Sequence, residues 1–195
     1  MIEFNESRHE YKKDGVIIPS VTQSIGMLYA GAFEKIPPAV LEYKTAVGSA
    51  VHLATQYHDE GCLDYDGLDD VVRGYVDGYL KFLAENKCEW SGIETLVYHP
   101  VHRYAGRLDR KGRVNGEFYY VDLKCVAHVS KVTGPQLAGY QAADEHTLPF
   151  FDRMAKPKRM ALQLKPNGTY ERHEFDSPND WPVFLSCLTV NRFTA

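Results

Sequence analysis

Residues 104–124 limit what this chain can fold into, because they set charged side chains among strand-forming aromatic and aliphatic ones. The segment reads YAGRLDRKGRVNGEFYYVDLK. Its pattern predicts two short strands joined by a polar turn region, which carries Lys111-Gly112 and Asn115-Gly116. We expect the first strand to end on Asp109 and the second strand to run over residues 118–125.

The second strand carries two charged side chains near its end. Asp122 and Lys124 are two residues apart and therefore point to the same face. If the two strands pair, Asp109 reaches that face too, and two carboxylates converge with one ammonium group. Such charges are costly in apolar surroundings unless they are paired or bound to metal, and oxygen ligands suit Mg²⁺ or Mn²⁺. A solvated ion pair at a strand end is an equally good interpretation of Asp122 and Lys124.

Composition sets broad limits on the class of protein. A chain of 195 residues with 44% hydrophobic and 25% charged residues is typical of one globular domain with a substantial core. The net charge of −4 gives no support for a nucleic-acid partner, so that inference has to rest on local charge. The four cysteines are widely spread and form no C-x-x-C pair, which argues against a zinc ribbon or a local iron–sulfur site.

The N-terminus indicates the expected location. Residues 1–4 lack a charged region followed by an apolar one, so no signal peptide is evident. No apolar run approaches membrane-spanning length. We therefore expect a cytoplasmic protein, in a bacterium or a phage-infected host cell, with no membrane partner.

The rest of the chain alternates between strand and helix patterns. The predicted elements are a small hairpin within 2–18 that turns at Asp14-Gly15, a helix starting at Val21, a helix over 37–45, a separate helix from Gly48, a helix over 68–83, a strand over 90–99, a helix over 136–145, a hairpin of 159–164 with 169–175 that turns at Asn167-Gly168, and a helix over 178–190. On the last helix the predicted buried side is Trp181, Phe184, Leu185 and Leu188.

Several polar residues have both a structural and a functional interpretation. Ser20 caps the helix at Val21, or together with Thr22 it contacts a phosphate at the helix start. His52 lies on a helix of small residues, where a histidine is usually a core or capping residue rather than a ligand. Glu94 is either a charge at the rim of a site or a further metal ligand.

Four motifs occur in a fixed order along the chain. They are G-x-x-x-H on a helix (Gly48, His52), G-x-x-D on a strand (Gly106, Asp109), D-x-K on a strand (Asp122, Lys124) and Q-x-x-x-Y on a helix (Gln136, Tyr140). This order resembles the RecB-like exonuclease branch of the PD-(D/E)XK nuclease superfamily, over roughly residues 14–145. The P-S-V-T segment at 19–22 is similar to the opening of a subgroup that contains phage exonucleases and the mitochondrial genome maintenance exonuclease.

The resemblance implies roles for individual residues. Asp109 and Asp122 match metal-binding, catalytic carboxylates, and Lys124 matches the catalytic lysine. His52 matches a histidine at the metal, and Glu94 falls where some members have a further acid. Gln136 and Tyr140, by default an ordinary surface pair, match a motif associated with the active site and DNA.

Two features depart from the family pattern. Cys125 follows the lysine where a serine or threonine is common. The C-terminal cysteine cluster of iron–sulfur relatives is absent, so no such cluster is expected.

Local charge agrees with a nucleic-acid substrate. Residues 103–113 contain five cationic side chains and only one acidic side chain. The cations are Arg103, Arg107, Arg110, Lys111 and Arg113. A cationic patch beside a metal site suits binding to the phosphate backbone. Arg107 and Lys111 are therefore candidate DNA contacts, beside Ser20, Thr22, Gln136 and Tyr140.

The resemblance implies an α/β (α+β) fold, with a central mixed β-sheet flanked by helices around a restriction-endonuclease-like core. We expect one nuclease domain over 1–195, made of an N-terminal part (1–87), a catalytic core (88–148) and a C-terminal hairpin and helix (149–195). The expected activity is that of a Mg²⁺- or Mn²⁺-dependent exonuclease acting on DNA ends or single strands in recombination, repair or phage DNA metabolism, with a recombination or replication protein as a further partner. The alternatives are a structure- or sequence-specific endonuclease and a non-catalytic DNA-binding module.

Overall fold

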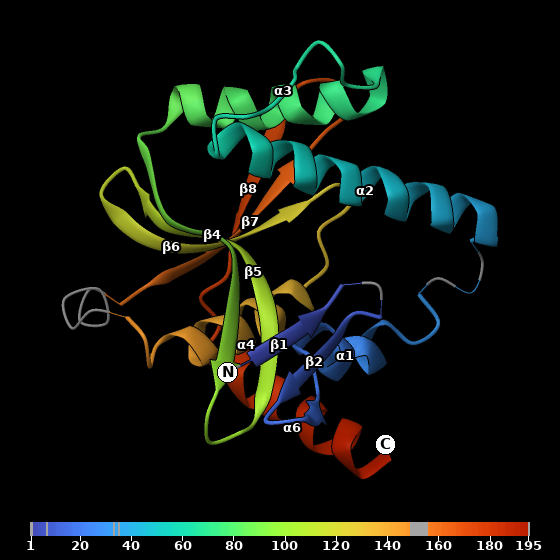
Figure 1. Ribbon diagram of the computed structural model, residues 1–195, viewed down its shortest axis with the longest axis vertical. Coiled ribbons are helices and arrows are strands. Elements are labelled where there is room, and N and C mark those ends of the chain that lie inside the picture. Colours follow the sequence, from blue (N-terminus) through green and yellow to red (C-terminus); the bar gives the residue numbers. More distant parts are fainter. Residues whose placement is uncertain (1, 7, 33, 35, 149–155, 195) are drawn as a thin grey trace.

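The computed structural model describes residues 2–6, 8–32, 34, 36–148 and 156–194 (Figure 1). Its centre is a five-stranded sheet in the order β4-β5-β6-β7-β8. The strands are β4 (Cys88–His99), β5 (Tyr104–Val114), β6 (Glu117–Lys124), β7 (Lys158–Leu164) and β8 (Tyr170–Glu174). β6 and β7 are parallel and the other neighbours antiparallel, so the sheet is mixed. The predicted α/β class, with a mixed sheet flanked by helices, is confirmed.

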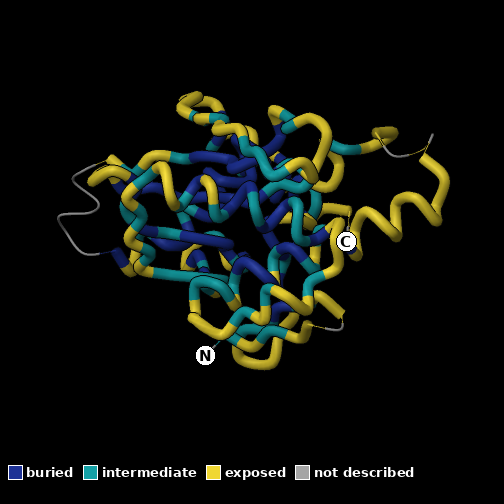
Figure 2. Tube along the Cα trace, turned by 90° about the horizontal axis from the view of Figure 1, so that it is seen from above, coloured by how far each residue is buried: buried dark blue, intermediate teal, exposed yellow. Residues whose placement is uncertain are grey.

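Helices cover both faces of this sheet (Figure 1). One layer contains α2 (Pro38–Asp59) and α3 (Asp70–Glu85), and the other contains α1 (Val21–Ile25), the short 3-10 helix η1 (Gly26–Tyr29), α4 (Thr133–Asp144) and α6 (Asp180–Thr194). Alternation along β6 serves both layers: Val121 and Leu123 pack toward α2 and α3, whereas Tyr120 packs toward α4 and α6. Figure 2 shows the buried segments of the chain at its centre and the exposed ones at the periphery.

A separate small sheet precedes the helices. It is the antiparallel meander β1 (Ile2–Asn5), β2 (Glu10–Lys13) and β3 (Val16–Ile18), and its buried residues pack on Ala105 of β5. The predicted turn at Asp14-Gly15 is confirmed, with φ of 53° and 78°. The prediction of a two-stranded hairpin was wrong, because β2 pairs on both of its edges.

The structure joins two predicted helices into one. The stretches 37–45 and 48 onward form the single 22-residue helix α2, so the predicted break before Gly48 is wrong. A glycine lowers helix propensity without ending a helix, and buried Val47 and Val51 on either side of Gly48 hold the helix to the core. Residues 38–46 are exposed, and this half of α2 projects beyond the rest of the molecule (Figures 1 and 2).

β5 is longer than expected. Gly112 lies inside the strand, with Trp90 opposite on one side and Tyr119 on the other, so the predicted end at Asp109 is wrong. The turn is confined to Asn115-Gly116, whose φ angles of 53° and 86° suit a tight hairpin turn. A Cβ at position 112 would lie 2.2 Å from the Glu89 carbonyl oxygen, so glycine here permits close strand approach rather than a turn.

The remaining elements agree with the sequence patterns. The capping box at Ser20 and Gln23 is present, and β7 and β8 form the predicted hairpin at Asn167-Gly168. On α6, Phe184 and Leu188 are buried as predicted, and Trp181 and Leu185 are half-buried. Within the described residues, no helix combines the length and apolarity that crossing a membrane requires.

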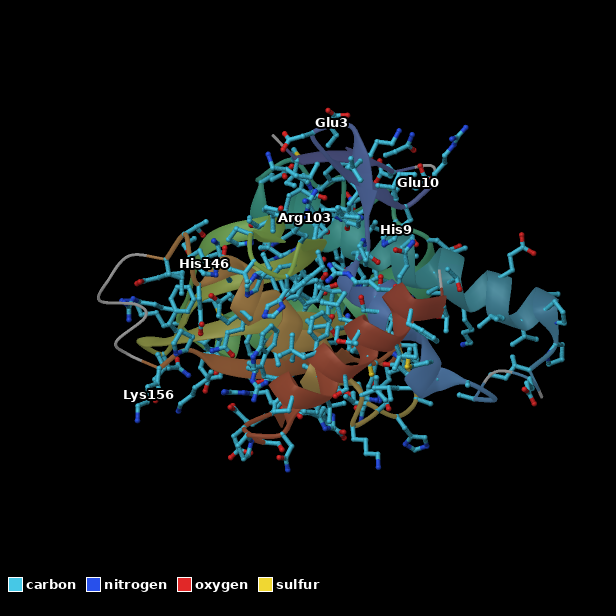
Figure 3. The ribbon with its side chains drawn as sticks, turned by 90° about the horizontal axis from the view of Figure 1, so that it is seen from below. Glu3, His9, Glu10, Arg103, His146 and Lys156 are labelled. Carbon is cyan, nitrogen blue, oxygen red and sulfur yellow. The ribbon has the colours of Figure 1, made fainter. Side chains whose placement is uncertain are left out.

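Three histidine rings gather where β4 ends. The His99 ring stacks on Trp181 of α6 at 5.9 Å, and its centroid lies 4.6 Å from that of His102 and 5.1 Å from that of His146. Figure 3 shows His146 well away from Glu3 and Glu10 of the small sheet. Burial, together with His102 and His146, lowers the pKa of His99 to about 4.

We expect His99 to make the fold acid-sensitive. The pKa of His99 is about 4 in the folded protein and 6.5 in the unfolded chain. Between these pH values the unfolded chain binds a proton that the folded protein does not, so the free energy of unfolding decreases as the pH falls from 6.5 to about 4. His102 is half-buried, and solvent screens its effect on His99. We therefore expect the free energy of unfolding to fall by about 1 to 2 kcal/mol, less than the full pKa shift would give. Urea unfolding from pH 7 to 4 should show the gap between wild type and His99→Asn narrowing by this amount. The exposed His128→Gln should follow the wild-type curve; a constant gap for His99→Asn would contradict the prediction.

Candidate metal site

The candidate site forms where β5 and β6 separate. Their ladder ends with Arg110 opposite Val121. The buried Asp109 carboxylate fills the gap beyond it, and its Oδ2 accepts a hydrogen bond of 2.6 Å from the Leu123 backbone N–H. Both strands therefore fix this carboxylate, and its Oδ1 faces α2.

Two further side chains approach Asp109. His52 Nδ1 on α2 lies 3.6 Å from Asp109 Oδ1 and 3.9 Å from Glu94 Oε1 on β4. One ligand atom from each of the three residues lies within 4.8 Å of the others, which is the arrangement of a possible metal site. Glu94 has a φ of 45°, a left-handed conformation that costs a non-glycine residue energy and is often found at functional sites. We call His52, Glu94 and Asp109 the ligand triad.

Asp122 and Lys124 form a second unit beside the triad. Lys124 Nζ lies 2.7 Å from Asp122 Oδ2 and donates to Gln136 Oε1 at 3.1 Å. Gln136 Nε2 in turn donates to Asp122 Oδ1 at 3.0 Å. This closed ring of contacts links the end of β6 to α4 and holds the ammonium group of Lys124 in one place.

Burial and mutual attraction control ionisation in the site. Burial raises the pKa of both Asp109 and Asp122, since water is lost around the carboxylates. Burial alone would lower the pKa of His52, but Asp109 and Glu94 outweigh it and raise that pKa to about 9. Burial likewise opposes the charge of Lys124, and Asp122 reverses the effect and raises its pKa. The site thus holds buried carboxylates whose negative charge a cation could stabilise.

Gln136 and Tyr140 lie in the interior of the fold rather than at its surface. Both side chains are buried, and Gln136 contacts both members of the D-x-K motif. The default interpretation of an ordinary surface pair is therefore wrong. Tyr140 packs on β5 at Gly106, where an added Cβ would lie 2.5 Å from Tyr140 Cε1 and 3.1 Å from Val21 Cγ2.

Gly106→Ala should therefore destabilise the fold. The methyl group would overlap the Tyr140 ring in a packed layer, and overpacking of this kind costs about 1 to 3 kcal/mol. Urea unfolding measures the loss. Gly26→Ala is the matched control, because no atom lies within 4 Å of its added Cβ, and it should be neutral or slightly stabilising. Equal stability of the two variants would contradict the close packing of Tyr140.

The other candidate DNA contacts come from two places, the start of α1 and the strand β5. Ser20 is buried, and its Oγ accepts from the Gln23 N–H, so the capping interpretation is confirmed; Thr22 is exposed beside it. Arg107 is half-exposed, with Nε 3.1 Å from Glu94 Oε2, and its guanidinium lies over the Phe4 ring. Lys111 is largely buried, and its Nζ lies 2.7 Å from Asp144 Oδ1 on α4.

The predicted cationic patch is wrong for Arg110. This side chain has no exposed surface and contacts Asp59 and Glu94. Charge counting along the sequence treated it as one of five surface cations. Its position next to Asp109, inside a strand with apolar partners, was the available signal that it is buried.

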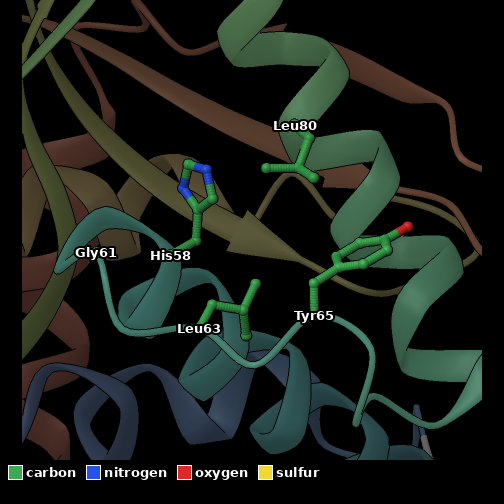
Figure 4. Close-up of a pocket in the computed structure, with 5 residues that line it drawn as sticks. All are labelled: His58, Gly61, Leu63, Tyr65 and Leu80. Carbon is green, nitrogen blue, oxygen red and sulfur yellow. The ribbon is translucent and has the colours of Figure 1, made fainter.

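One surface cavity lies away from the triad. A cavity of about 410 Å³ between the end of α2 and α3 is lined by His58, Gly61, Leu63, Tyr65 and Leu80 (Figure 4). None of the triad or of the Asp122–Lys124 pair lines it. Its lining contains no acidic side chain and so lacks the carboxylates that the triad offers.

No family model matches the sequence, and no curated protein matches it. Among solved structures, the chain is similar to the crystal structure of LHK-Exo in complex with dAMP. The TM-score is 0.37 and the sequence identity 10%, over 91% of this chain and 87% of that chain. At this TM-score the likeness carries no argument about chemistry, which the side chains of the site have to supply.

Proposed function

We propose that this chain is a metal-dependent nuclease that hydrolyses DNA phosphodiester bonds, as an exonuclease on DNA ends or single strands. One observation carries the proposal: the ligand triad lies beside a lysine held by a buried aspartate. Hydrolysis of a phosphodiester needs an activated water, an aligned attack and compensation of charge on the phosphate. A cation site next to a fixed ammonium group suits all three needs.

The donor set fits a divalent cation. The triad offers one imidazole nitrogen and two carboxylates, and carboxylates suit Mg²⁺ and Mn²⁺. Asp122 supplies a further carboxylate: its buried Oδ2 lies 2.7 Å from Lys124 Nζ, and a carboxylate oxygen has a second lone pair for a cation. We propose that His52, Glu94, Asp109 and Asp122 hold Mg²⁺ or Mn²⁺. When bound, such an ion lowers the pKa of a water and neutralises charge on the phosphate.

The protein's own groups would then act as follows. Asp109 is held rigid by the Leu123 N–H, so it presents one oxygen in a fixed direction. Lys124, anchored by Asp122 and Gln136, orients the attacking water or stabilises the developing charge on a phosphate oxygen. Arg107 lies at the edge of the triad and is half-exposed, which suits a contact to the DNA backbone.

The decisive experiment compares end-labelled linear single strands with closed circular single strands. An exonuclease digests the linear DNA in Mg²⁺ or Mn²⁺, leaves the circles intact and stops in a chelator. Cleavage of the circles would show an endonuclease instead. If the protein binds both DNAs but cleaves neither of them in Mg²⁺ or in Mn²⁺, the catalytic proposal is overturned and the chain is a DNA-binding module.

A further inference from the structure

Arg110 is a long cationic side chain with no exposed surface, next in sequence to a member of the ligand triad. We propose that Arg110 is a positioning residue that sets the relative geometry of His52, Glu94 and Asp109. The inference rests on the proposed metal site, and it adds a residue whose action passes through the ligands rather than through the substrate.

Two members of the triad contact the same nitrogen of Arg110. Its Nη1 lies 3.3 Å from Glu94 Oε1 and donates to the Asp109 carbonyl oxygen at 2.7 Å. One nitrogen therefore ties the carboxylate from β4 to the backbone of β5. A shift of this nitrogen would move Glu94 relative to Asp109.

The third member is reached through α2. Arg110 Nη2 donates to Thr55 Oγ1 at 3.2 Å, and Thr55 Oγ1 donates to the His52 carbonyl oxygen at 2.9 Å. One turn further along α2, Asp59 Oδ2 lies 2.6 Å from Arg110 Nε. His52, Thr55 and Asp59 lie on the same side of the helix, so the guanidinium group runs along α2 and fixes its distance from β4 and β5.

The guanidinium group is itself fixed from behind. It lies over the Tyr79 ring at 5.8 Å, and the Tyr79 hydroxyl donates to Asp59 Oδ2 at 2.6 Å. Trp90 Nε1 donates to the Tyr79 hydroxyl at 3.1 Å. A planar fork with several donors matches these partners in three directions, whereas a lysine is a single point donor on a flexible stem. Outer partners of this kind orient metal ligands in many proteins.

The test removes the buried pair without leaving a lone charge, by combining Asp59→Asn with Arg110→Met. The matched control combines Arg159→Met with Asp180→Asn, because Arg159 Nη2 and Asp180 Oδ2 form a mostly buried pair at 3.1 Å in the other layer. Calorimetry with Mn²⁺ should give a dissociation constant about 10 to 100 times higher for the Arg110 double variant and an unchanged one for the control. Thermal unfolding of both variants separates this effect from a general loss of stability. Equal Mn²⁺ affinity in the two double variants would overturn the positioning role.

A metal-free crystal structure of the Arg110 double variant separates this inference from the proposed function. If wild type binds neither Mn²⁺ nor Mg²⁺, the proposed metal site has failed. The variant structure then decides the role of Arg110: displacement of Glu94 and His52 supports it, and unchanged positions overturn it.

Discussion

Lys124→Ala should lower the rate of DNA cleavage by about 10²-fold or more while the chain still folds, because it removes a preorganised charge at the reacting phosphate. The ammonium group is fixed between Asp122 and Gln136, and alanine carries no charge to that position. The loss of rate should appear in kcat rather than in KM, since the proposed contacts of other side chains to the DNA backbone are kept.

The matched control is Lys131→Ala, which removes an exposed lysine from the loop that follows β6. It should cut DNA at the wild-type rate. Melting curves of both variants check folding, and we expect Asp122 to keep its hydrogen bond to Gln136 in each. A Lys124→Ala protein as fast as wild type would remove Lys124 from the mechanism.

Asp109→Asn should abolish metal binding and cleavage together. Asp109 Oδ1 lies 3.6 Å from His52 Nδ1, and Oδ2 accepts a hydrogen bond from the Leu123 N–H, which an asparagine carbonyl oxygen can also accept. Loss of a direct ligand should weaken Mn²⁺ binding by more than about 100-fold, beyond the effect of outer-shell changes. Burial raises the pKa of Asp109, so the neutral side chain should leave the metal-free protein equally stable or more stable at neutral pH.

Two further aspartates calibrate this result. Asp144→Asn changes another buried carboxylate, bound by Lys111 and Tyr120, and should bind Mn²⁺ like wild type. Asp122→Asn should also abolish binding; unchanged affinity would leave His52, Glu94 and Asp109 as the complete ligand set. Wild-type affinity in Asp109→Asn would mean that the triad is not the metal site.

Much of the fold followed from local patterns. The Ser20 cap, the turn at Asn167-Gly168 and the shared face of Asp122 and Lys124 depend on a few neighbouring residues and on strand alternation. The helix break before Gly48 and the turn at Lys111-Gly112 were predicted from local signals that include a glycine, and both predictions were wrong. In both places, packing on residues distant in the sequence decided the conformation.

The same distinction between local pattern and packing applies to the candidate site. The sequence by itself indicated which residues carry chemistry and which of them share a strand face, because those properties repeat with the period of the backbone. Only the tertiary structure decided which other charges meet: Arg110 with Asp59 and Glu94, and Lys111 with Asp144. Those pairs join separate elements. A buried charge is costly unless an opposite charge lies close to it, and the packing of α2 and α4 on the sheet determines which opposite charge that is.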